Sequence, residues 1–302
     1  MSEAALPARP AALARSDTGH AVPVLTLVAL LLVVWYVACV PMNAVVTETR
    51  LGTRDVGWAE WLKASWSLER AVLPAPHQIA VELWNTVVVA KPWTPRSLIF
   101  HGWVTLSSTL VGFLMGTVLG IALAIAIVHV KSLNKSLMPW IVASQTIPIL
   151  AIAPMVIVVL GSIGFTGLIP KSIISTYLCF FPVTIGMVKG MNAPEVMQLD
   201  LMRTYNASRA QVFVKLRWPT SMPFLFASLK VAIAIALVGA IVGELPTGAQ
   251  AGIGARLLNG SYYGQTTQIW AALVAASAMA ACLVALVGFL ERLTLKRMGG
   301  RP

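Results

Sequence analysis

Side chains that could carry out acid–base or ion-coupled chemistry are sparse in the apolar part of this chain. No Asp or Glu occurs between Ser97 and Gly190, and His101 and His129 stand near opposite ends of one apolar run. A carrier driven by an ion gradient keeps ionisable residues inside its spans, because the coupling proton or ion needs a site there. Glu244 follows a later apolar run without an evident partner. The pattern therefore disfavours a proton relay.

Motifs of membrane hydrolases and of nucleotide binding are also missing from the sequence. It contains no H-E-x-x-H and no paired carboxylates, and Gly161–Gly164 does not form a nucleophile elbow. Without a G-x-x-x-x-G-K motif the chain has no P-loop of its own. Cys39, Cys179 and Cys282 share no metal-ligand spacing and fall in apolar runs, which predicts small core residues and no metal site. We expect a non-catalytic chain, so that any uphill transport takes its energy from another subunit.

Composition assigns the chain to a membrane. Its 302 residues are 58% hydrophobic and 11% charged, with a mean hydropathy of +0.80, against about 25% charged residues in soluble domains. The apolar residues form blocks of roughly 20, the length that crosses about 30 Å of hydrocarbon. This predicts an all-α, polytopic membrane protein of about six transmembrane helices. The net charge of +11 then indicates basic cytoplasmic loops, with no nucleic acid as partner.

The expected spans divide the chain as follows. A loose tail over 1–20 precedes a first span at 21–46, for which a cleavable signal peptide is the alternative; the run is longer than a usual h-region and no A-x-A site closes it. The segment 47–96 mixes charges with tryptophans and includes an amphipathic stretch over 76–90, as is typical of a surface at headgroup level. Further spans are predicted at 104–130, 137–161, 172–190, 223–243 and 269–290, before a tail over 291–302.

The distribution of basic residues indicates how the chain is oriented in the membrane. Six spans place both termini on one side. That side, with the loops 131–136 and 189–222 and with Lys230 near the edge of the second loop, collects 14 of the 22 Lys and Arg residues. By the positive-inside rule this side is cytoplasmic. The long polar loop 190–222 is therefore expected in the cytoplasm.

Two spans contain residues that shape helices. Gly112, Gly116 and Gly120 form two overlapping G-x-x-x-G steps, which predict close helix packing rather than lipid-facing glycines. Pro148 and Pro154 are expected to bend or break the third span, because each removes an intrahelical hydrogen bond.

A broken helix at membrane depth is tolerated where it is buried in protein or lines a cavity. The candidates for lining a pathway are therefore Ser144, Gln145, Pro148, Pro154 and Glu244. Ordinary interhelical hydrogen bonding is the alternative for the polar pair before the break.

The cytoplasmic loop is predicted to form two short helices. The first covers about 194–205, Asn206 is a plausible left-handed break, and Ser208 can cap a second helix over 209–217 that ends at Pro219. Such a helical hairpin with an exposed polar turn suits docking to a partner. A merely solvated loop is the alternative.

This loop resembles the signature of permeases of binding-protein-dependent ABC importers, which is E-A-A, three residues, G, nine residues, I-x-L-P. Asp200 stands at the first position, Asn206 at the glycine and Pro219 at the proline. Over about 74–290 the chain is similar to the nitrate, sulfonate and taurine branch. The segments that carry this similarity are Leu73–Pro76, the glycine span, the Pro148/Pro154 segment, Phe181–Pro182, Gly243–Glu244 and Gly252–Gly254.

The resemblance implies a type I-like permease fold with its transmembrane domain over 97–290 and a coupling loop over 190–222. It implies cytoplasmic ABC ATPase subunits that bind the ATP, a periplasmic solute-binding protein and commonly a homodimer in the lipid of the bacterial inner membrane. No cofactor is expected on this chain. The expected cargo is a nitrate-, sulfonate- or taurine-like anion, or a small heteroaromatic precursor. Contacts with the ATPase are expected from Asp200, Arg203, Thr204, Asn206, Ala207, Ser208, Arg209, Phe213 and Pro219. A self-powered secondary carrier or channel is the alternative.

Overall fold

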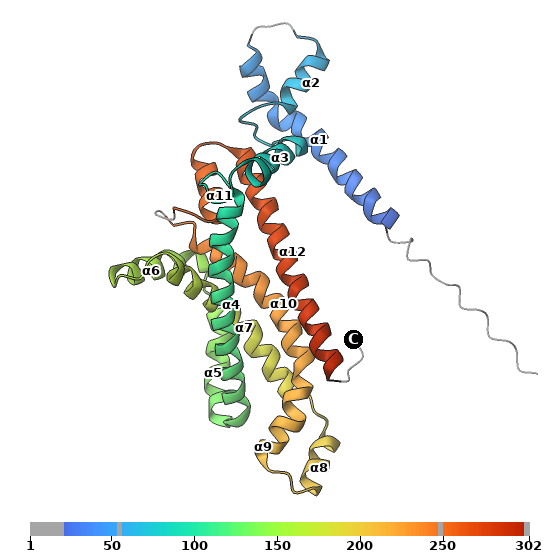
Figure 1. Cartoon of the computed structure of the whole chain (residues 1–302), viewed down its shortest axis with the longest axis vertical. Helices are drawn as coiled ribbons and strands as arrows, with labels where there is room; N and C mark the ends of the chain where they lie inside the picture. Colours follow the sequence, from blue (N-terminus) through green and yellow to red (C-terminus); the bar gives the residue numbers. More distant parts are fainter. Residues whose placement is uncertain (1–20, 53–55, 247–249, 299–302) are drawn as a thin grey trace, which may run out of the picture. The chain divides into compact units, whose positions relative to one another are not determined.

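The structure, a computed structural model, describes residues 21–52, 56–246 and 250–298, and these ranges contain helices but no strands. The predicted all-α fold is confirmed. Within the described ranges, five helices are long and apolar enough to cross a membrane, and a bent pair of shorter helices raises the number to six. The chain divides into two compact units, residues 1–78 and 79–302 (Figure 1).

The first unit is a helical hairpin held by a buried amide. Helix α1 (Ala21–Leu51) continues beyond the predicted end at 46 and is followed by α2 (Trp58–Trp66). Asn43 of α1 is 1% exposed. Its amide nitrogen donates to the carbonyl oxygens of Ser65 (3.2 Å) and Leu73 (2.9 Å), and its oxygen accepts from the Leu73 N–H (3.1 Å). The amide thus ties α1 to the segment that follows α2.

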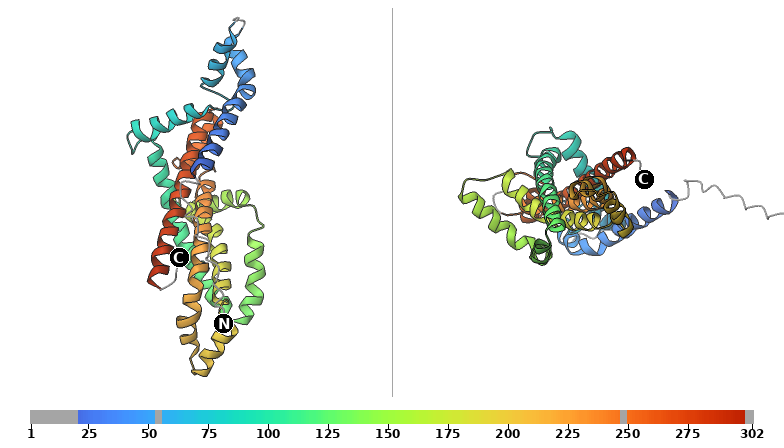
Figure 2. Two further views of the ribbon diagram at one scale, coloured as in Figure 1. Left: turned by 90° about the vertical axis from the view of Figure 1, so that its right-hand side faces the viewer. Right: turned by 90° about the horizontal axis from the view of Figure 1, so that it is seen from below.

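The second unit is a bundle of long helices. Its first helical segment combines α3 (Pro76–Trp84), which begins at the boundary of the units, with a π-turn over Asn85–Val89. The bundle contains α4 (Leu98–His129), α7 (Leu168–Met191), α10 (Trp218–Gly243) and α12 (Thr266–Arg297). Helix α7 packs against both α4 and α10, and α12 packs against α10 (Figure 2). Four of the predicted spans coincide with these helices within a few residues.

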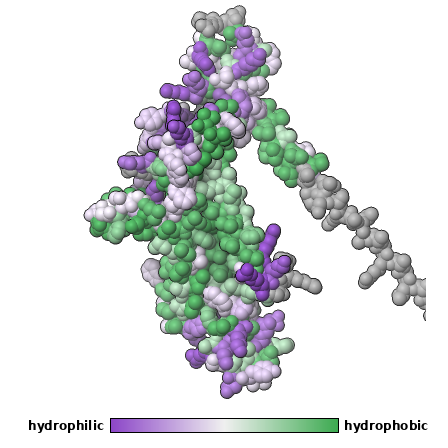
Figure 3. Space-filling view, in the orientation of Figure 1, coloured by the Kyte–Doolittle hydropathy of each residue, from purple (hydrophilic) through white to green (hydrophobic). Residues whose placement is uncertain are grey.

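Hydrophobic side chains cover the middle of this bundle, and hydrophilic ones gather at its lower end in Figure 3. An ion pair between Lys230 of α10 and Glu291 of α12 joins these helices. Helix α11 (Ile253–Tyr262) packs against α12 at the opposite end. Together with the length of the helices, this distribution is that of a multi-pass membrane protein.

The glycines of α4 lie where this helix meets α7. Gly112, Gly116 and Gly120 are buried, and a Cβ at each would lie 2.1 to 2.8 Å from an atom of α7. The Thr176 hydroxyl donates to the carbonyl oxygen of Gly112 at 3.1 Å. The absence of side chains therefore permits a close helix contact, and the glycines do not face lipid.

The third predicted span is broken at one place. Helices α5 (Lys131–Ser144) and α6 (Ile149–Ser162) meet at an angle of 98° across 145–148. The break coincides with Pro148, as predicted. A break or bend at Pro154 was also predicted, and α6 is not broken at this residue. A single proline removes one hydrogen bond, which the remaining turns of α6 tolerate.

The cysteines do not share one environment. Cys39 and Cys179 are buried, as predicted, whereas Cys282 is exposed on α12. The prediction of a core position for Cys282 is therefore wrong. An apolar run does not tell the inner face of a membrane helix from its outer face, because lipid and protein neighbours are both apolar.

Candidate functional site

A helical hairpin closes one end of the bundle of the second unit. It consists of α8 (Val196–Thr204), a short turn and α9 (Arg209–Val212). Asn206 has a φ of 49°, so the turn is made in the left-handed conformation that Asn tolerates. The Ser208 hydroxyl accepts from the Gln211 N–H (3.3 Å), and the Gln211 side chain accepts from the Ser208 N–H (2.8 Å). This capping box fixes the start of α9, where the sequence predicted it.

The second arm of the hairpin does not end at Pro219. A π-turn over Phe213–Arg217 leads directly into α10, and 209–243 form one continuous helix of 35 residues. The predicted end at Pro219 is therefore wrong. Pro219 lies in the first turn of α10, and the wider π-turn before it accommodates a residue that has no N–H. Arg217 anchors this arm, because its guanidinium donates to the Met191 carbonyl and to the Asn192 side chain, both at 3.3 Å.

Most of the residues expected to contact the ATPase are open to solvent. Arg203 and Asp200 form an ion pair of 2.8 Å with side chains that are 80% and 55% exposed. The Thr204 hydroxyl donates to the Asp200 carbonyl at 3.0 Å. Asn206, Ser208 and Arg209 are exposed, and Ala207 is half-buried. These side chains surround the turn on the outer surface of the hairpin.

Phe213 is placed differently. It is half-buried, with its ring centroid 5.3 Å from that of His129 and 5.9 Å from that of Trp218. The structure therefore puts Phe213 between the hairpin and the bundle, where it supports the second arm.

Sequence reasoning missed an apolar stripe on α8. Met197, Leu201 and Tyr205 are 79%, 56% and 76% exposed. Their spacing of four residues puts them along one face of α8 and its C-terminal cap. The same spacing was visible in the sequence, but its exposure depends on α8 standing free of the bundle. The hairpin thus presents an apolar face beside a polar turn.

The break between α5 and α6 carries the polar pair predicted for a pathway. The Ser144 hydroxyl donates to the Ile141 carbonyl at 2.7 Å, and the carbonyl of Ser144 accepts from the Tyr177 hydroxyl. Gln145 is exposed, with its amide nitrogen 3.5 Å from the Ser144 hydroxyl. Because Tyr177 belongs to α7, its hydroxyl ties the end of α5 to the bundle. Gln145 itself lies exposed at the break.

Glu244, directly after α10, is wholly buried at the end of the bundle opposite the hairpin. Its carboxylate accepts from the Thr105 hydroxyl (2.9 Å) and from the Gly254 N–H (2.9 Å). The Lys171 ammonium lies 3.5 Å from the same carboxylate. The sequence showed no partner for Glu244, and the structure supplies three donors, of which Thr105 and Lys171 come from distant parts of the chain.

This carboxylate holds a tight loop at the start of α11. The Ile253 N–H donates to the Thr105 hydroxyl at 2.9 Å, and the Gly252 N–H donates to Nδ1 of His101 at 3.0 Å. Gly252 has a φ of 128°, and a Cβ there would lie 2.1 Å from the Glu244 carboxyl carbon. Only glycine fits this position, both for conformation and for space.

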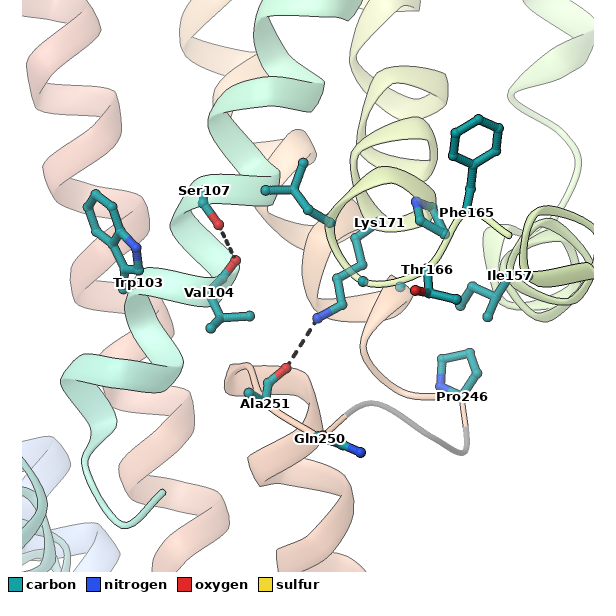
Figure 4. A pocket seen from close by; sticks show the side chains of 15 residues that line it. Trp103, Val104, Ser107, Ile157, Phe165, Thr166, Lys171, Pro246, Gln250 and Ala251 are labelled. Atoms are coloured by element: carbon teal, nitrogen blue, oxygen red, sulfur yellow. Dashed lines mark hydrogen bonds between the residues drawn. The ribbon is translucent and has the colours of Figure 1, made fainter. Parts of the chain in front are cut away.

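A cavity of about 710 Å³ lies next to the ion pair (Figure 4). Its described walls come from α4, from 157–171 in and between α6 and α7, and from Gly243, Pro246, Gln250 and Ala251. The Lys171 ammonium, beside the cavity, donates to the Ala251 carbonyl at 3.1 Å. Trp103 and Phe165 stand on opposite sides of the cavity, with Thr166 near Phe165. The volume lies within the range of small-molecule sites.

Further charges at this end belong to α11. The Arg256 guanidinium donates to the Arg96 carbonyl at 3.3 Å, and burial lowers the pKa of Arg256 from its ordinary value. Its charge persists, because arginine is not deprotonated in proteins. In the ranges that the structure describes, no three His, Cys, Asp or Glu side chains are grouped to hold a metal ion.

Comparison with known proteins agrees with the hairpin. Residues 116–300 match the family model described as "Binding-protein-dependent transport system inner membrane component", which is more than half of the chain. The riboflavin transport system permease protein RibX of Chloroflexus aurantiacus is 32% identical over 225 residues, covering 74% of this chain and 80% of the relative.

Two further relatives carry different substrate names. The formylaminopyrimidine transport permease protein ThiX of Halalkalibacterium halodurans is 29% identical over 184 residues, covering 61% of this chain and 68% of the relative. The putative aliphatic sulfonates transport permease protein SsuC of Bacillus subtilis is 23% identical over 267 residues, covering 84% and 93%. The long apolar helices, the free-standing hairpin and these matches lead to one conclusion: the chain belongs to the family of inner membrane components of binding-protein-dependent transport systems, the permeases of ABC importers.

Proposed function

We propose that this chain forms the translocation pathway of an ABC importer and that the α8–α9 hairpin couples it to a separate ATPase, which binds the ATP. The hairpin carries this proposal. None of the residues of its first arm, α8, is buried, its turn is fixed by Asn206 and Ser208, and it lies in a chain that belongs to the permease family.

Two features of the hairpin suit a protein partner. Met197, Leu201 and Tyr205 offer an apolar stripe that burial in a groove would remove from water. Arg209 adds an exposed positive charge after the turn, and the exposed ion pair of Arg203 with Asp200 lies before it. A partner with an apolar groove and acidic rim would complement both features.

The rest of the assembly follows from the family. We place the hairpin, both termini and the C-terminal tail in the cytoplasm of a bacterial cell, since the hairpin side of the chain holds most of the basic residues. A solute-binding protein then delivers cargo at the end of the bundle that carries α11. A second copy of the chain completes the pathway, with Ser144, Gln145, Pro148 and Pro154 as candidates for its lining.

Negative charges introduced at the turn test the coupling role. Arg209→Glu and Ala207→Glu place a carboxylate at the turn without touching the bundle, and each should reduce co-purification of the ATPase at least tenfold and abolish ATP-dependent uptake. Like charges brought together in an interface cost several kcal/mol. Lys296→Glu, on the exposed end of α12, is the matched control and should retain both activities. Wild-type co-purification and uptake in the turn variants would refute the coupling role.

A further inference from the structure

The cavity beside Lys171 is not accounted for by packing or by the coupling hairpin. We propose, building on the proposed function above, that it is a binding site of the permease for an uncharged, planar heteroaromatic solute with carbonyl or ring-nitrogen acceptors. The argument rests on the charge balance of the cavity, on its free donor and on its walls.

The charge balance disfavours a free anion. Among the described residues that line the cavity, Lys171 alone has a charged side chain. The Glu244 carboxylate lies 3.5 Å from its ammonium group. The ammonium is thus already neutralised by a buried carboxylate. A nitrate or sulfonate in this cavity would have to share that cation with Glu244 and would gain little attraction from it. An uncharged solute does not depend on such an attraction.

A free N–H of Lys171 favours a solute that carries a hydrogen-bond acceptor. An ammonium group has three N–H donors. For Lys171 the carbonyl of Ala251 takes one, and the carboxylate of Glu244 takes a second. The third remains for a ligand. Two contacts fix the ammonium in place, so that a carbonyl or ring nitrogen would meet a donor that is already oriented.

The walls favour a flat, apolar body. Trp103 and Phe165 stand on opposite sides, and Val104, Ile157 and Leu168 contribute aliphatic surface. Aromatic rings in offset-stacked or edge-to-face contact add about 0.5–1.5 kcal/mol beyond burial. The polar groups at the wall, Thr166 and Gln250 among them, can meet the edge of a heterocycle. Two relatives are named for riboflavin and for a formylaminopyrimidine, which are solutes of this kind.

The site also has a suitable location. It lies at the end of the bundle opposite the hairpin, which is where the proposed orientation places the binding protein. A solute released by the binding protein would meet this cavity before the middle of the bundle.

A glycine in the wall allows the cavity to be filled without disturbing the fold. Gly161 lines the cavity on α6, and a Cβ there would meet no atom within 4 Å. Gly161→Leu should occupy part of the space. Gly102→Leu is the matched control, since Gly102 is also helical, is equally free of neighbours and does not line the cavity.

The experiment measures equilibrium binding to the full chain in lipid nanodiscs, without ATPase or binding protein. The probes are riboflavin, followed by fluorescence quenching, and formylaminopyrimidine, taurine and nitrate, followed by calorimetry. We expect one of the two heteroaromatic probes to bind the wild type, with at least tenfold weaker binding to Gly161→Leu and unchanged binding to Gly102→Leu. Taurine and nitrate should not bind.

Three results would overturn the inference: no binding of any probe, equal binding by Gly161→Leu and the wild type, or binding of taurine or nitrate that Gly161→Leu abolishes. ATP-dependent uptake with the ATPase and binding protein is measured separately. Uptake without probe binding would support the proposed function and refute this site. Probe binding through the cavity without uptake would support the site and refute the proposed function.

Discussion

Adding one methyl group at Gly116 should measure how closely α4 and α7 are packed. A Cβ at this position would lie 2.1 Å from Sγ of Cys179 and 3.1 Å from the carbonyl oxygen of Thr176. Ordinary contacts between carbon atoms lie at about 3.5–4.0 Å. The helices must therefore separate, or Cys179 must move, when Gly116→Ala is made. Overpacking costs about 1–3 kcal/mol, and a contact of 2.1 Å belongs at the upper end of this range, above the roughly 1 kcal/mol that alanine gains over glycine in a helix.

The assay is the apparent unfolding midpoint of the purified chain in a mild detergent. After that gain the net loss is about 2 kcal/mol, which corresponds to a fall of about 4–8 °C for a protein of this size. Gly102→Ala in the same helix is the control, because its Cβ would meet nothing within 4 Å, and its midpoint should be unchanged or higher. Cys179→Ala should recover part of the loss in the Gly116→Ala background, since it removes the nearest atom. Equal midpoints for Gly116→Ala and Gly102→Ala would refute the close helix contact.

Three further outcomes are expected. Glu244→Gln should destabilise the chain by about 3–5 kcal/mol, since it leaves Lys171 buried without its counter-charge. Adding Lys171→Met should reduce that loss, and additive changes in the unfolding midpoint would show that the two groups do not interact. Cysteines at Tyr205 and Tyr262, which are 76% and 70% exposed, should report orientation in a background without the native cysteines: an impermeant thiol reagent on intact cells should label position 262 only, and the reverse pattern would invert the proposed topology. Gln145→Trp should impair uptake while the ATPase still co-purifies, and normal uptake would remove Gln145 from the pathway.

The positions of the membrane helices were predictable because a spanning helix must satisfy its own backbone and expose apolar side chains over a fixed length. The hairpin turn was predictable for a similar local reason. Asn206 tolerates a positive φ, and Ser208 caps the next helix through a residue three positions away. In both cases the determining interactions lie within a few residues of each other.

Features that depend on distant neighbours were not predictable. Glu244 was expected near a pathway, yet it is buried by Thr105, which is 139 residues away, and by Lys171. Phe213 was grouped with the exposed turn but packs against His129 from another helix. No local pattern specifies such pairs, since they exist only once the helices are assembled.

The unbroken helix over 209–243 has a mechanical consequence. At 1.5 Å per residue its 35 residues measure about 50 Å, so that one rod connects the hairpin turn with the residue before Glu244. A tilt applied at the hairpin reaches the opposite end as a sideways shift that grows with distance from the pivot. Glu244 would carry this shift directly into the loop that begins α11, because its carboxylate is hydrogen-bonded to that loop. A movement of the hairpin would in this way reach the start of α11 through a single buried carboxylate.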